Sequence, residues 1–274
     1  MATISFPPSF NFRNEFNSAL LNGHLSLHYQ PIVDLENGHV KGFEALMRWN
    51  HPEHGPIPPS GFIPVAVESG LIIAASKWAL KEACRALKRI EGRIGQVKDL
   101  YMSVNFTASD FAEDNFLDDL YQIISVSDVL PTQIQLEITE ELLLSQPESA
   151  KNTLALCRKA GLKIAVDDFG TGSRELGFLE EFPIDSIKLD RSLVRHFIEN
   201  PDALESFRPA LAIAKARHLT VTAEGIEQRE EALALKELGC NTAQGYYFAK
   251  PLPEKDVTEL LLEASGFAEK LKSH

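Results

Sequence analysis

Residues 25–49 read LSLHYQPIVDLENGHVKGFEALMRW, and this stretch decides the fold. Two apolar and β-branched runs, Leu25–Val33 and Val40–Trp49, flank the short segment Asp34–Gly38. Within that segment, Asn37-Gly38 is typical of a tight β-hairpin turn. Parallel neighbours need a crossover connection of a dozen or more residues, so we expect these two strands to be antiparallel.

The rest of the chain alternates strand-like runs with helix-like segments. The further strand-like runs are Leu100–Asn105, Ile134–Thr139, Leu162–Asp168, Ser186–Asp190, Leu219–Glu224 and Thr242–Phe248. Amphipathic stretches lie between them at Ser76–Ile90, Pro147–Ala160, Pro201–Ala216 and Glu227–Leu238. This alternation indicates an α/β protein with a parallel sheet. Eight strands in 274 residues favour a closed (β/α)8, TIM-like barrel, here with an antiparallel first strand. The proline-dense stretch His51–Pro64 is expected to be a loop.

Composition excludes several classes of protein. With 39 acidic and 27 basic residues the formal charge is −12, which argues against a DNA or RNA polymer as partner. A small phosphorylated ligand remains compatible, because a bound metal ion reverses the local sign. No apolar run reaches about 18 residues, so no membrane span is expected. Three separated cysteines, no C-x-x-C pair and no recognisable signal peptide favour a reducing, cytoplasmic location.

The strand-like runs carry polar residues on one face. Side chains alternate along a strand, so Gln135, Glu137 and Thr139 oppose the apolar Ile134, Leu136 and Ile138. The same alternation groups further residues on the polar faces: Ser103, Asn105, Ala165, Asp167, Ser186, Lys188, Asp190, Thr220, Thr222 and Glu224. Asp168 falls on the apolar face of its run. Because the outer helices need the apolar face, we expect the polar face to look into the barrel.

Several carboxylates and one lysine would then converge at the strand ends, where barrel enzymes place their chemistry. Buried carboxylates pair, bind metal or take up protons. Carboxylate and amide ligands without Cys or His suit Mg²⁺ or Mn²⁺. Taken singly, each residue has a simpler explanation: Asp167 or Asp168 as a helix N-cap, Glu44 as an ion-pair partner of Arg48, and Lys188 as a solvated edge residue. Inward polar residues on successive strands favour the metal site.

Other catalytic motifs are absent from the sequence. No G-x-S-x-G elbow, P-loop or G-x-G-x-x-G fingerprint occurs, and the eight histidines show no ligand spacing.

The chain resembles the EAL domain of cyclic di-GMP phosphodiesterases in a series of ordered blocks. These blocks are Tyr29–Val33, Glu44–Leu46, Arg48–Trp49, His51–Gly55, Asn105, Leu136–Glu140, Asp167–Gly172, Ile187–Asp190, Ala223–Glu227 and Gln244–Gly245. The resemblance extends over residues 16–262. It implies a (β/α)8 barrel with a reversed first strand, a homodimer, and hydrolysis of cyclic di-GMP to linear pGpG with Mg²⁺ or Mn²⁺.

The resemblance also implies a set of metal ligands. Glu44, Asn105, Glu137 and Asp167 match the ligands of a first ion. Asp167 would bridge to a second ion, which Asp168 and Glu224 would serve directly or through water. Two such ions activate water and offset the charge of a phosphodiester.

Further roles follow from the same resemblance. Lys188 matches the residue that positions the attacking water, and Glu224 matches a proposed general base. Arg48 would contact a phosphate oxygen, and Gln244 would help to orient water at the catalytic mouth. Glu140 would hold the Asp167–Gly172 loop. Substrate contacts are expected at Arg48, Gln30, Leu46, Asp190 and Glu227.

One segment departs from the family. After Gly172 the family usually continues Tyr-Ser-Ser, whereas this chain reads Ser173-Arg174-Glu175. In relatives this segment couples the second metal site to dimer contacts, so we expect the change to affect dimer geometry or activation. Every expected metal ligand is retained.

Two alternative functions remain open. A catalytically silent receptor would bind cyclic di-GMP without cleaving it, although such receptors typically lose metal ligands. An enolase-like Mg²⁺ site would use strand-end carboxylates with Lys188, but it leaves Arg48 and the doubled Asp167-Asp168 unexplained. The expected domain organisation is an N-terminal extension (residues 1–15), one barrel (16–265) and a C-terminal tail (266–274).

Overall fold

The hairpin expected from residues 25–49 is present in the computed structural model. Strands β1 (Leu25–Asp34) and β2 (Val40–His51) are antiparallel along their whole length, with Gln30 opposite Glu44. Asp34 Oδ1 accepts hydrogen bonds from the first amides of the turn, and Gly38 has the positive φ of +74° that the turn requires. The structure describes residues 10–95, 99–145, 147–169, 180–200, 208, 211–263 and 267–271.

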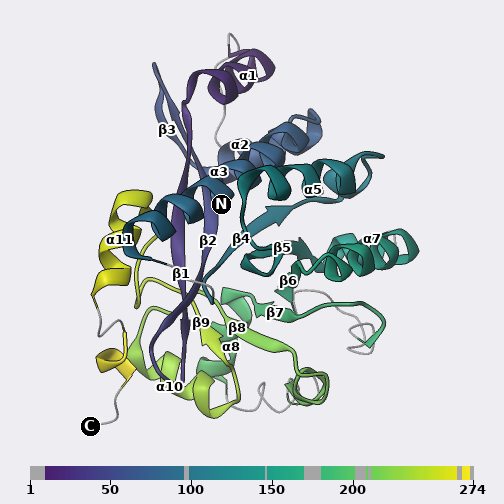
Figure 1. Ribbon diagram of the computed structural model, residues 1–274. Helices are drawn as coiled ribbons and strands as arrows, with labels where there is room; N and C mark the ends of the chain where they lie inside the picture. The colour runs from purple at the N-terminus through teal and green to yellow at the C-terminus, as the bar shows by residue number, and fades with distance from the viewer. Residues whose placement is uncertain are drawn as a thin grey trace.

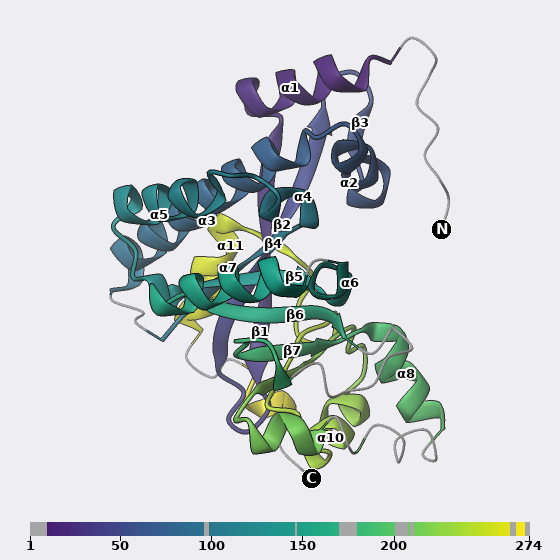
Figure 2. The ribbon, with the colours of Figure 1, turned by 90° about the vertical axis from the view of Figure 1, so that its right-hand side faces the viewer.

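The hairpin is part of a closed eight-stranded barrel (Figures 1 and 2). The remaining barrel strands are β4 (Tyr101–Phe106), β5 (Ile134–Thr139), β6 (Lys163–Phe169), β7 (Ser186–Leu189), β8 (Thr220–Ala223) and β9 (Thr242–Ala243). They are parallel to one another and to β2, and β1 closes the barrel by antiparallel pairing with β2 and β9. The predicted fold class and the reversed first strand are therefore confirmed.

The alternation of the strands determines what lies on each side of the sheet. The apolar residues of β5, Ile134, Leu136 and Ile138, are fully buried under the outer helices. The helices around the barrel are α3 (Ile72–Ile94), α4 (Ala108–Phe111), α5 (Phe116–Ser127), α6 (Glu140–Ser145), α7 (Pro147–Lys159), α8 (Arg191–Glu199), α10 (Arg229–Glu237) and α11 (Glu254–Leu262). A short 3-10 turn (Pro131–Gln133) precedes β5. The inner faces are left with polar residues, as the sequence predicted.

The predicted helices are found within these bounds. Ser76–Ile90 lies inside α3, Pro147–Ala160 corresponds to α7, and Glu227–Leu238 contains α10. Of Pro201–Ala216, residues 208 and 211–216 are helical, and the others lie outside the described residues.

A second hydrophobic cluster lies beyond one end of the barrel, among α1 (Phe12–Asn22), β3 (Gly55–Ile57) and α2 (Pro59–Glu68) (Figure 2). Trp49 lies at its centre in edge-to-face contact with Phe16 and Phe62. The prediction of a loop over His51–Pro64 is wrong, because this stretch contains β3 and the first six residues of α2. Proline is tolerated in a first helical turn, where its missing N–H is not needed, so Pro59 begins α2.

The last predicted strand is shorter than expected. Thr242–Phe248 was predicted, but only Thr242–Ala243 pairs with β8, and the chain then turns at Gly245. The additional strand β10 (Leu252–Pro253) pairs with β1. The sequence did not predict β3 or β10, since strands this short carry no alternation to detect.

Both ends of the described chain pack on the rest of the molecule. α1 begins at Phe12, within the predicted N-terminal extension. Phe267 and Leu271, which the sequence placed in the C-terminal tail, are buried, and the short turn Glu269–Leu271 lies near α10. The tail also covers the hairpin turn, because a Cβ on Gly38 would lie 2.3 Å from Ala268 N.

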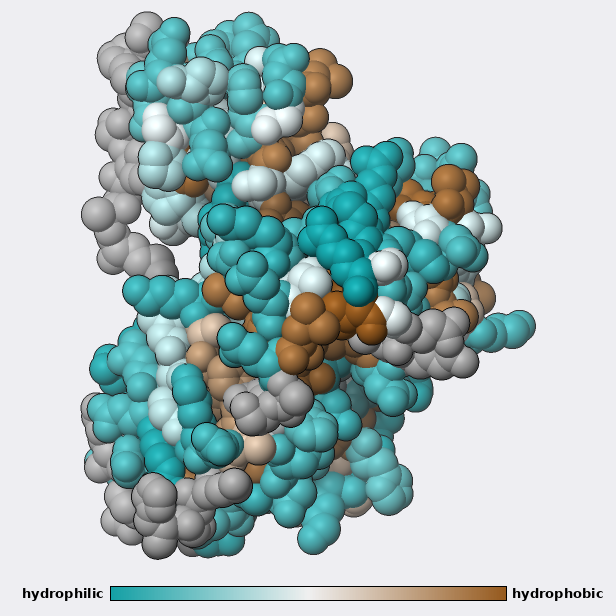
Figure 3. Space-filling view, turned by 60° about the vertical axis from the view of Figure 1, so that its left-hand side comes forward, coloured by the Kyte–Doolittle hydropathy of each residue, from teal (hydrophilic) through white to brown (hydrophobic). Residues whose placement is uncertain are grey.

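The three cysteines are free and buried, and burial raises the pKa of each thiol to about 12. Over the described ranges, none of the helices combines the length and the apolar character needed to cross a bilayer. On the face drawn in Figure 3, hydrophilic residues predominate and hydrophobic ones form smaller patches.

Candidate active site

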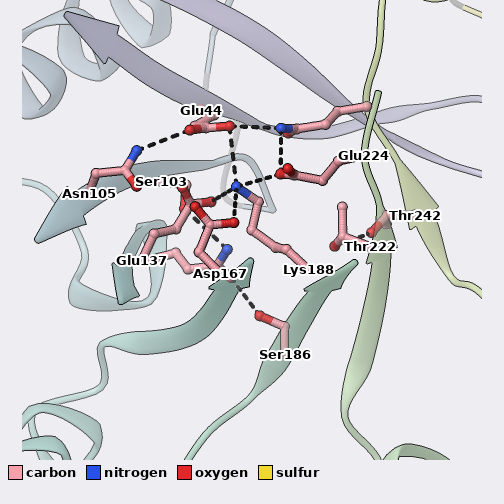
Figure 4. A network of polar contacts seen from close by, with 12 residues as sticks. Glu44, Ser103, Asn105, Glu137, Asp167, Ser186, Lys188, Thr222, Glu224 and Thr242 are labelled. Carbon is pink, nitrogen blue, oxygen red and sulfur yellow. Dashed lines mark hydrogen bonds and ion pairs between the residues drawn. The ribbon is translucent and has the colours of Figure 1, made fainter. Parts of the chain in front are cut away.

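Polar side chains meet inside the barrel at the carboxyl ends of the parallel strands (Figure 4). Each comes from an inward strand position or from the residue just after a strand. The set comprises Glu44 on β2, Asn105 on β4, Glu137 on β5, Asp167 on β6, Lys188 on β7, Glu224 after β8 and Gln244 after β9. The structure thus brings together the four expected first-ion ligands with Lys188, Glu224 and Gln244.

Lys188 stands at the centre of this cluster. Its Nζ lies 3.2 Å from Glu44, 3.0 Å from Glu137, 3.1 Å from Asp167 and 2.7 Å from Glu224. Lys188 is almost completely buried. One ammonium group therefore faces four carboxylates, and the cluster carries excess negative charge when all of them are ionised.

Two amide side chains fix the edges of the cluster. Asn105 Nδ2 donates to Glu44 Oε1 at 3.0 Å. Gln244 Nε2 donates both to Glu44 Oε2 at 2.7 Å and to Glu224 Oε1 at 2.8 Å. Gln244 therefore joins the carboxylate of the hairpin strand β2 to that of the loop after β8.

The charges in the cluster shift one another's protonation. Burial opposes ionisation of Glu44, but Lys188 and the amides of Gln244 and Asn105 outweigh it and lower its pKa. Burial and then the charge of Glu44 raise the pKa of Glu137 well above its usual range. Burial raises the pKa of Glu224 to about 8, with Lys188 acting in the opposite direction. Although burial opposes its charge, Lys188 has a pKa well above its ordinary value because four carboxylates surround it.

The cluster has oxygens suited to a hard cation. Glu137 Oε1 and Asp167 Oδ1 are buried against the Lys188 ammonium group. Among the described residues, Glu137 Oε2 and Gln244 Oε1 are buried without a hydrogen-bond partner. Oxygen donors with surplus negative charge fit Mg²⁺ or Mn²⁺. In the described part of the chain, however, no three acidic, His or Cys side chains are arranged as a preformed metal site, because Lys188 Nζ holds the centre.

A second polar layer supports the cluster from deeper in the barrel. Gln135 Nε2 donates to Ser103 Oγ at 3.2 Å, and Ser186 Oγ donates to Gln135 Oε1 at 3.5 Å. Thr222 and Thr242 share a hydrogen bond of 2.8 Å. Ser186, Thr222 and Thr242 occupy inward positions (Figure 4), so the barrel interior is polar below the carboxylates as well.

Asp168 departs from the alternation that places its neighbours. The pairing of β6 with β7 shifts between Val166 and Phe169, and Asp168 takes a left-handed φ of +52°. Asp tolerates this conformation better than most residues do. Its side chain reaches the surface, but the surrounding protein still removes part of its hydration, and this desolvation together with the charge of Asp167 raises its pKa. The irregularity takes Asp168 out of the regular alternation in which it would share a face with Ile164 and Val166.

The expected substrate contacts lie around the mouth rather than in the cluster. Arg48 Nη1 donates to the Met47 carbonyl at 2.8 Å, and the described residues form no ion pair between Arg48 and Glu44. Gln30 donates to the Ala249 carbonyl at 3.4 Å, while Leu46 is half-buried on β2. A cavity of about 180 Å³ adjoins Glu224, lined by Gln30, Arg191, Glu224, Gly225, Glu227, Gln244, Gly245 and Tyr246.

Three other predicted residues have local partners. Asp190 caps α8 by accepting from the Ser192 amide, and Glu227 accepts from Arg191. Glu140 is buried at the start of α6. The loop that Glu140 was expected to hold continues from Gly170 outside the described residues, as does the departure at Ser173–Glu175.

Sequence reasoning missed Arg191 and Gly225. Arg191 follows the recognised Ile187–Asp190 block directly, and Gly225 lies inside the Ala223–Glu227 block. The position of Gly225 directly after the predicted catalytic Glu224 could have indicated its importance. A glycine at such a position is typical of a left-handed backbone or of another group packed closely against the backbone.

Comparison with known proteins agrees with the family that the sequence motifs indicate. The family model described as EAL domain matches residues 13–251. Cyclic di-GMP phosphodiesterase NbdA of Pseudomonas aeruginosa is 34% identical over 247 residues, covering 90% of this chain and 31% of that protein. Cyclic di-GMP phosphodiesterase PdeR of Escherichia coli is 35% identical, covering 90% of this chain and 38% of its own length.

A solved structure shares the architecture closely. The PaMucR phosphodiesterase in complex with c-di-GMP superposes with a TM-score of 0.84 at 32% identity, covering 90% of this chain and 100% of that one. The chain spans only 29–38% of the length of these curated relatives, which are much longer proteins.

Proposed function

Because the chain belongs to the EAL domain family, we propose that it is a phosphodiesterase that hydrolyses cyclic di-GMP to linear pGpG with two bound Mg²⁺ or Mn²⁺ ions. The names of NbdA and PdeR support the substrate and the reaction. The PaMucR complex with c-di-GMP supports a binding site of this kind on the same fold.

The observation that carries the proposal is the convergence of four carboxylates on one lysine. When all four carboxylates are ionised, their negative charge exceeds that of Lys188 by three. Within the described residues, Glu137 Oε2 is also buried without a hydrogen-bond partner. Divalent cations would relieve both conditions. The residues that would hold the first ion are Glu44, Asn105, Glu137 and Asp167, and those for the second are Asp167, Asp168 and Glu224.

Lys188 must change partners in this proposal. Its ammonium group now contacts all four carboxylates, so it would withdraw from some of them when cations bind. When bound, the ions would lower the pKa of a coordinated water and offset the charge of the phosphodiester. Lys188 would then orient the attacking water and stabilise negative charge that develops beside it.

The remaining residues bind the substrate or accept the proton of the attacking water. Glu224 is the group we assign to accept a proton from the attacking water, and Gln244 holds its carboxylate in place through a 2.8 Å hydrogen bond. Arg48 presents a planar guanidinium that can grip a phosphate with two donors. Gln30 and Leu46 lie on the two hairpin strands at the mouth, where a guanine would lie.

A hydrolysis assay with product identification tests the proposal. We expect the purified protein to convert cyclic di-GMP to pGpG with Mg²⁺ or Mn²⁺, and we expect a chelator to stop the reaction. Binding of the intact nucleotide without turnover would reject the enzyme and favour the silent receptor. Turnover that persists in excess chelator would reject the role of the ions.

Two expectations of the resemblance concern the whole protein. A homodimer would give twice the 30.4 kDa chain mass in light scattering. A cytoplasmic location would be tested by fractionating cells that produce the protein. Neither expectation alters the chemistry proposed for the site.

A further inference from the structure

The loop that carries Glu224 is held from below by the strands. The Glu224 amide donates to the Leu189 carbonyl at 3.1 Å, next to Lys188. The Ile226 amide donates to the Gln244 carbonyl at 3.2 Å. The backbone after β8 is therefore tied both to the strand that carries Lys188 and to the segment that carries Gln244.

The same loop is enclosed from two sides at glycines. Gly225 has φ +68°, and a Cβ there would lie 2.3 Å from Arg191 Cγ and 2.6 Å from Arg191 Cβ. A Cβ on Gly245 would lie 2.1 Å from the Ile226 carbonyl oxygen. The aliphatic part of Arg191 thus lies directly against the Gly225 backbone, and Gly245 approaches the loop through the backbone of Ile226.

An ion pair closes this contact. Arg191 Nη2 donates to Glu227 Oε1, so the guanidinium reaches past Gly225 to the far end of the loop. Arg191 is the first residue of α8 and lies three positions after Lys188. Its side chain therefore joins the connection that follows Lys188 to the connection that contains Glu224.

We propose that Arg191 is a positioning residue, which sets the location of Glu224 relative to Lys188 and Gln244 by packing on Gly225 and pairing with Glu227. This inference rests on the proposed function for its kinetic consequence. Glu224 Oε1 lies 2.7 Å from Lys188 Nζ and 2.8 Å from Gln244 Nε2, distances that leave little room for movement of the loop. Partners that orient a metal ligand commonly change affinity or activity by about 10–100-fold when removed.

Because the ion pair between Arg191 and Glu227 is exposed, an effect on the position of Glu224 can be distinguished from an effect on the folding stability of the protein. The side chains of Arg191 and Glu227 are 51% and 41% exposed. Exposed ion pairs contribute little to folding stability, so their loss shifts the melting temperature by less than about 4 °C. A large change in catalysis at this pair would therefore report geometry at Glu224 and not unfolding.

Three variants separate the packing of Arg191 on Gly225 from its ion pair with Glu227. Arg191→Met keeps an aliphatic stem over Gly225 and removes the ion pair, Arg191→Ala removes both, and Arg191→Lys retains stem and charge. Arg85→Ala is the matched control, because Arg85 forms an exposed ion pair with Glu82 on α3. Each protein is measured for kcat and KM with cyclic di-GMP, for Mn²⁺ affinity without nucleotide, and for melting temperature.

We expect Arg191→Ala to lower kcat and Mn²⁺ affinity by about 10–100-fold. KM for the nucleotide should stay within about twofold, since the proposal gives Arg191 no direct contact with substrate. Arg191→Met should show a smaller loss, Arg191→Lys should recover part of it, and Arg85→Ala should behave as wild type.

Two results would overturn the proposal. One is an unchanged kcat with unchanged Mn²⁺ affinity in Arg191→Ala. The other is a raised KM with unchanged kcat, which would make Arg191 a substrate contact. If the wild type binds Mn²⁺ but hydrolyses nothing, the proposed function fails alone. The Mn²⁺ affinities then decide about Arg191, with a loss in Arg191→Ala supporting the proposal and no loss overturning it.

Discussion

Lys188 shows how much of a site depends on single side chains. The strand alternation predicted that Lys188, Glu137 and Glu224 point into the barrel, and the structure places them there. The sequence could not predict that one Nζ would lie within 3.2 Å of four carboxylates, because that depends on how far each side chain reaches across the barrel. Alternation gives the face of a residue but not the position of its terminal atoms.

Removing one carboxylate tests the proposed ligand set at the residue scale. We expect Glu44→Ala to lower the hydrolysis rate roughly 100-fold or more, since a first-ion ligand is lost. The fold should persist, because the change also reduces the excess negative charge of the cluster. Turnover measured beside circular dichroism checks both points. Glu68→Ala, at an exposed position on α2, is the control, and a near-normal rate in Glu44→Ala would contradict the assignment.

The raised pKa of Glu224 predicts a pH dependence of stability in chelator. The folded protein holds this proton up to a pH of about 8, whereas the unfolded chain releases it near 4.5. The contribution to the free energy of unfolding is therefore complete below 4.5 and is lost as the pH rises towards 8. The lowered pKa of Glu44 acts below that range.

Urea unfolding at pH 5, 6.5 and 8 measures this effect, with Glu224→Gln as the comparison that removes the titrating group. We expect the urea midpoint of the wild type to fall with pH more steeply than that of the variant, and Mg²⁺ to reduce the fall. Identical slopes in wild type and variant would show that Glu224 does not titrate in this range.

At the scale of elements, the end of β6 is where the regular pattern stops. The sequence placed Asp168 on the apolar face, whereas the resemblance assigned it to the second ion. The left-handed backbone at Asp168 and the shifted pairing of β6 with β7 account for the difference, since a residue there no longer follows the alternation. Backbone irregularities of this kind leave little trace in hydrophobic periodicity.

Two substitutions at Asp168 separate backbone from charge. Asn tolerates the left-handed region, so Asp168→Asn should keep the stability of the wild type and lose activity through the missing carboxylate. Asp168→Val should in addition destabilise the protein by about 1–2 kcal/mol, because a β-branched residue is disfavoured at φ +52°. Paired measurements of urea midpoint and turnover test this. Equal stability of the two variants would contradict the strained backbone.

Prolines and short pairings limited the prediction of other elements. The eight barrel strands were predicted because their runs are long or end in polar residues, although the last was overestimated. The sequence does not predict β3 and α2 within His51–Pro64, since a high density of prolines is typical of a loop. Proline at a helix start has the opposite meaning, and distinguishing the two needs the packing of Phe62 against Trp49.

At the scale of the whole molecule, the C-terminal segment is part of the packed structure. Lys270 Nζ donates to the carbonyls of Tyr247 and Phe248, and Tyr247 Oη donates back to the Lys270 carbonyl at 2.6 Å. Tyr247 and Phe248 lie three and four residues beyond Gln244. Sequence reasoning placed residues 266–274 outside the barrel because no periodic pattern marks so short a segment.

Truncation tests that boundary. A chain ending at residue 266 should lose about 3–6 kcal/mol of stability, since Phe267 and Leu271 are buried and each contributes about 1.5–3 kcal/mol. Its activity should also fall, because the segment around Gln244 loses its contacts with Lys270. Glu269→Ala, which changes an exposed side chain of the same turn, is the control. A truncated chain as stable as the wild type would support the predicted tail.

The most direct test of the account is anomalous diffraction from a crystal grown with Mn²⁺ and a cyclic di-GMP analogue that resists hydrolysis. We predict two manganese peaks about 3.5–4 Å apart. One peak should lie within coordinating distance of Glu44, Asn105, Glu137 and Asp167, with Lys188 Nζ moved away from at least one of the three carboxylates among them. The other should lie near Asp167, Asp168 and Glu224. An anomalous map without peaks between these side chains, while the nucleotide is bound, would contradict a two-ion phosphodiesterase.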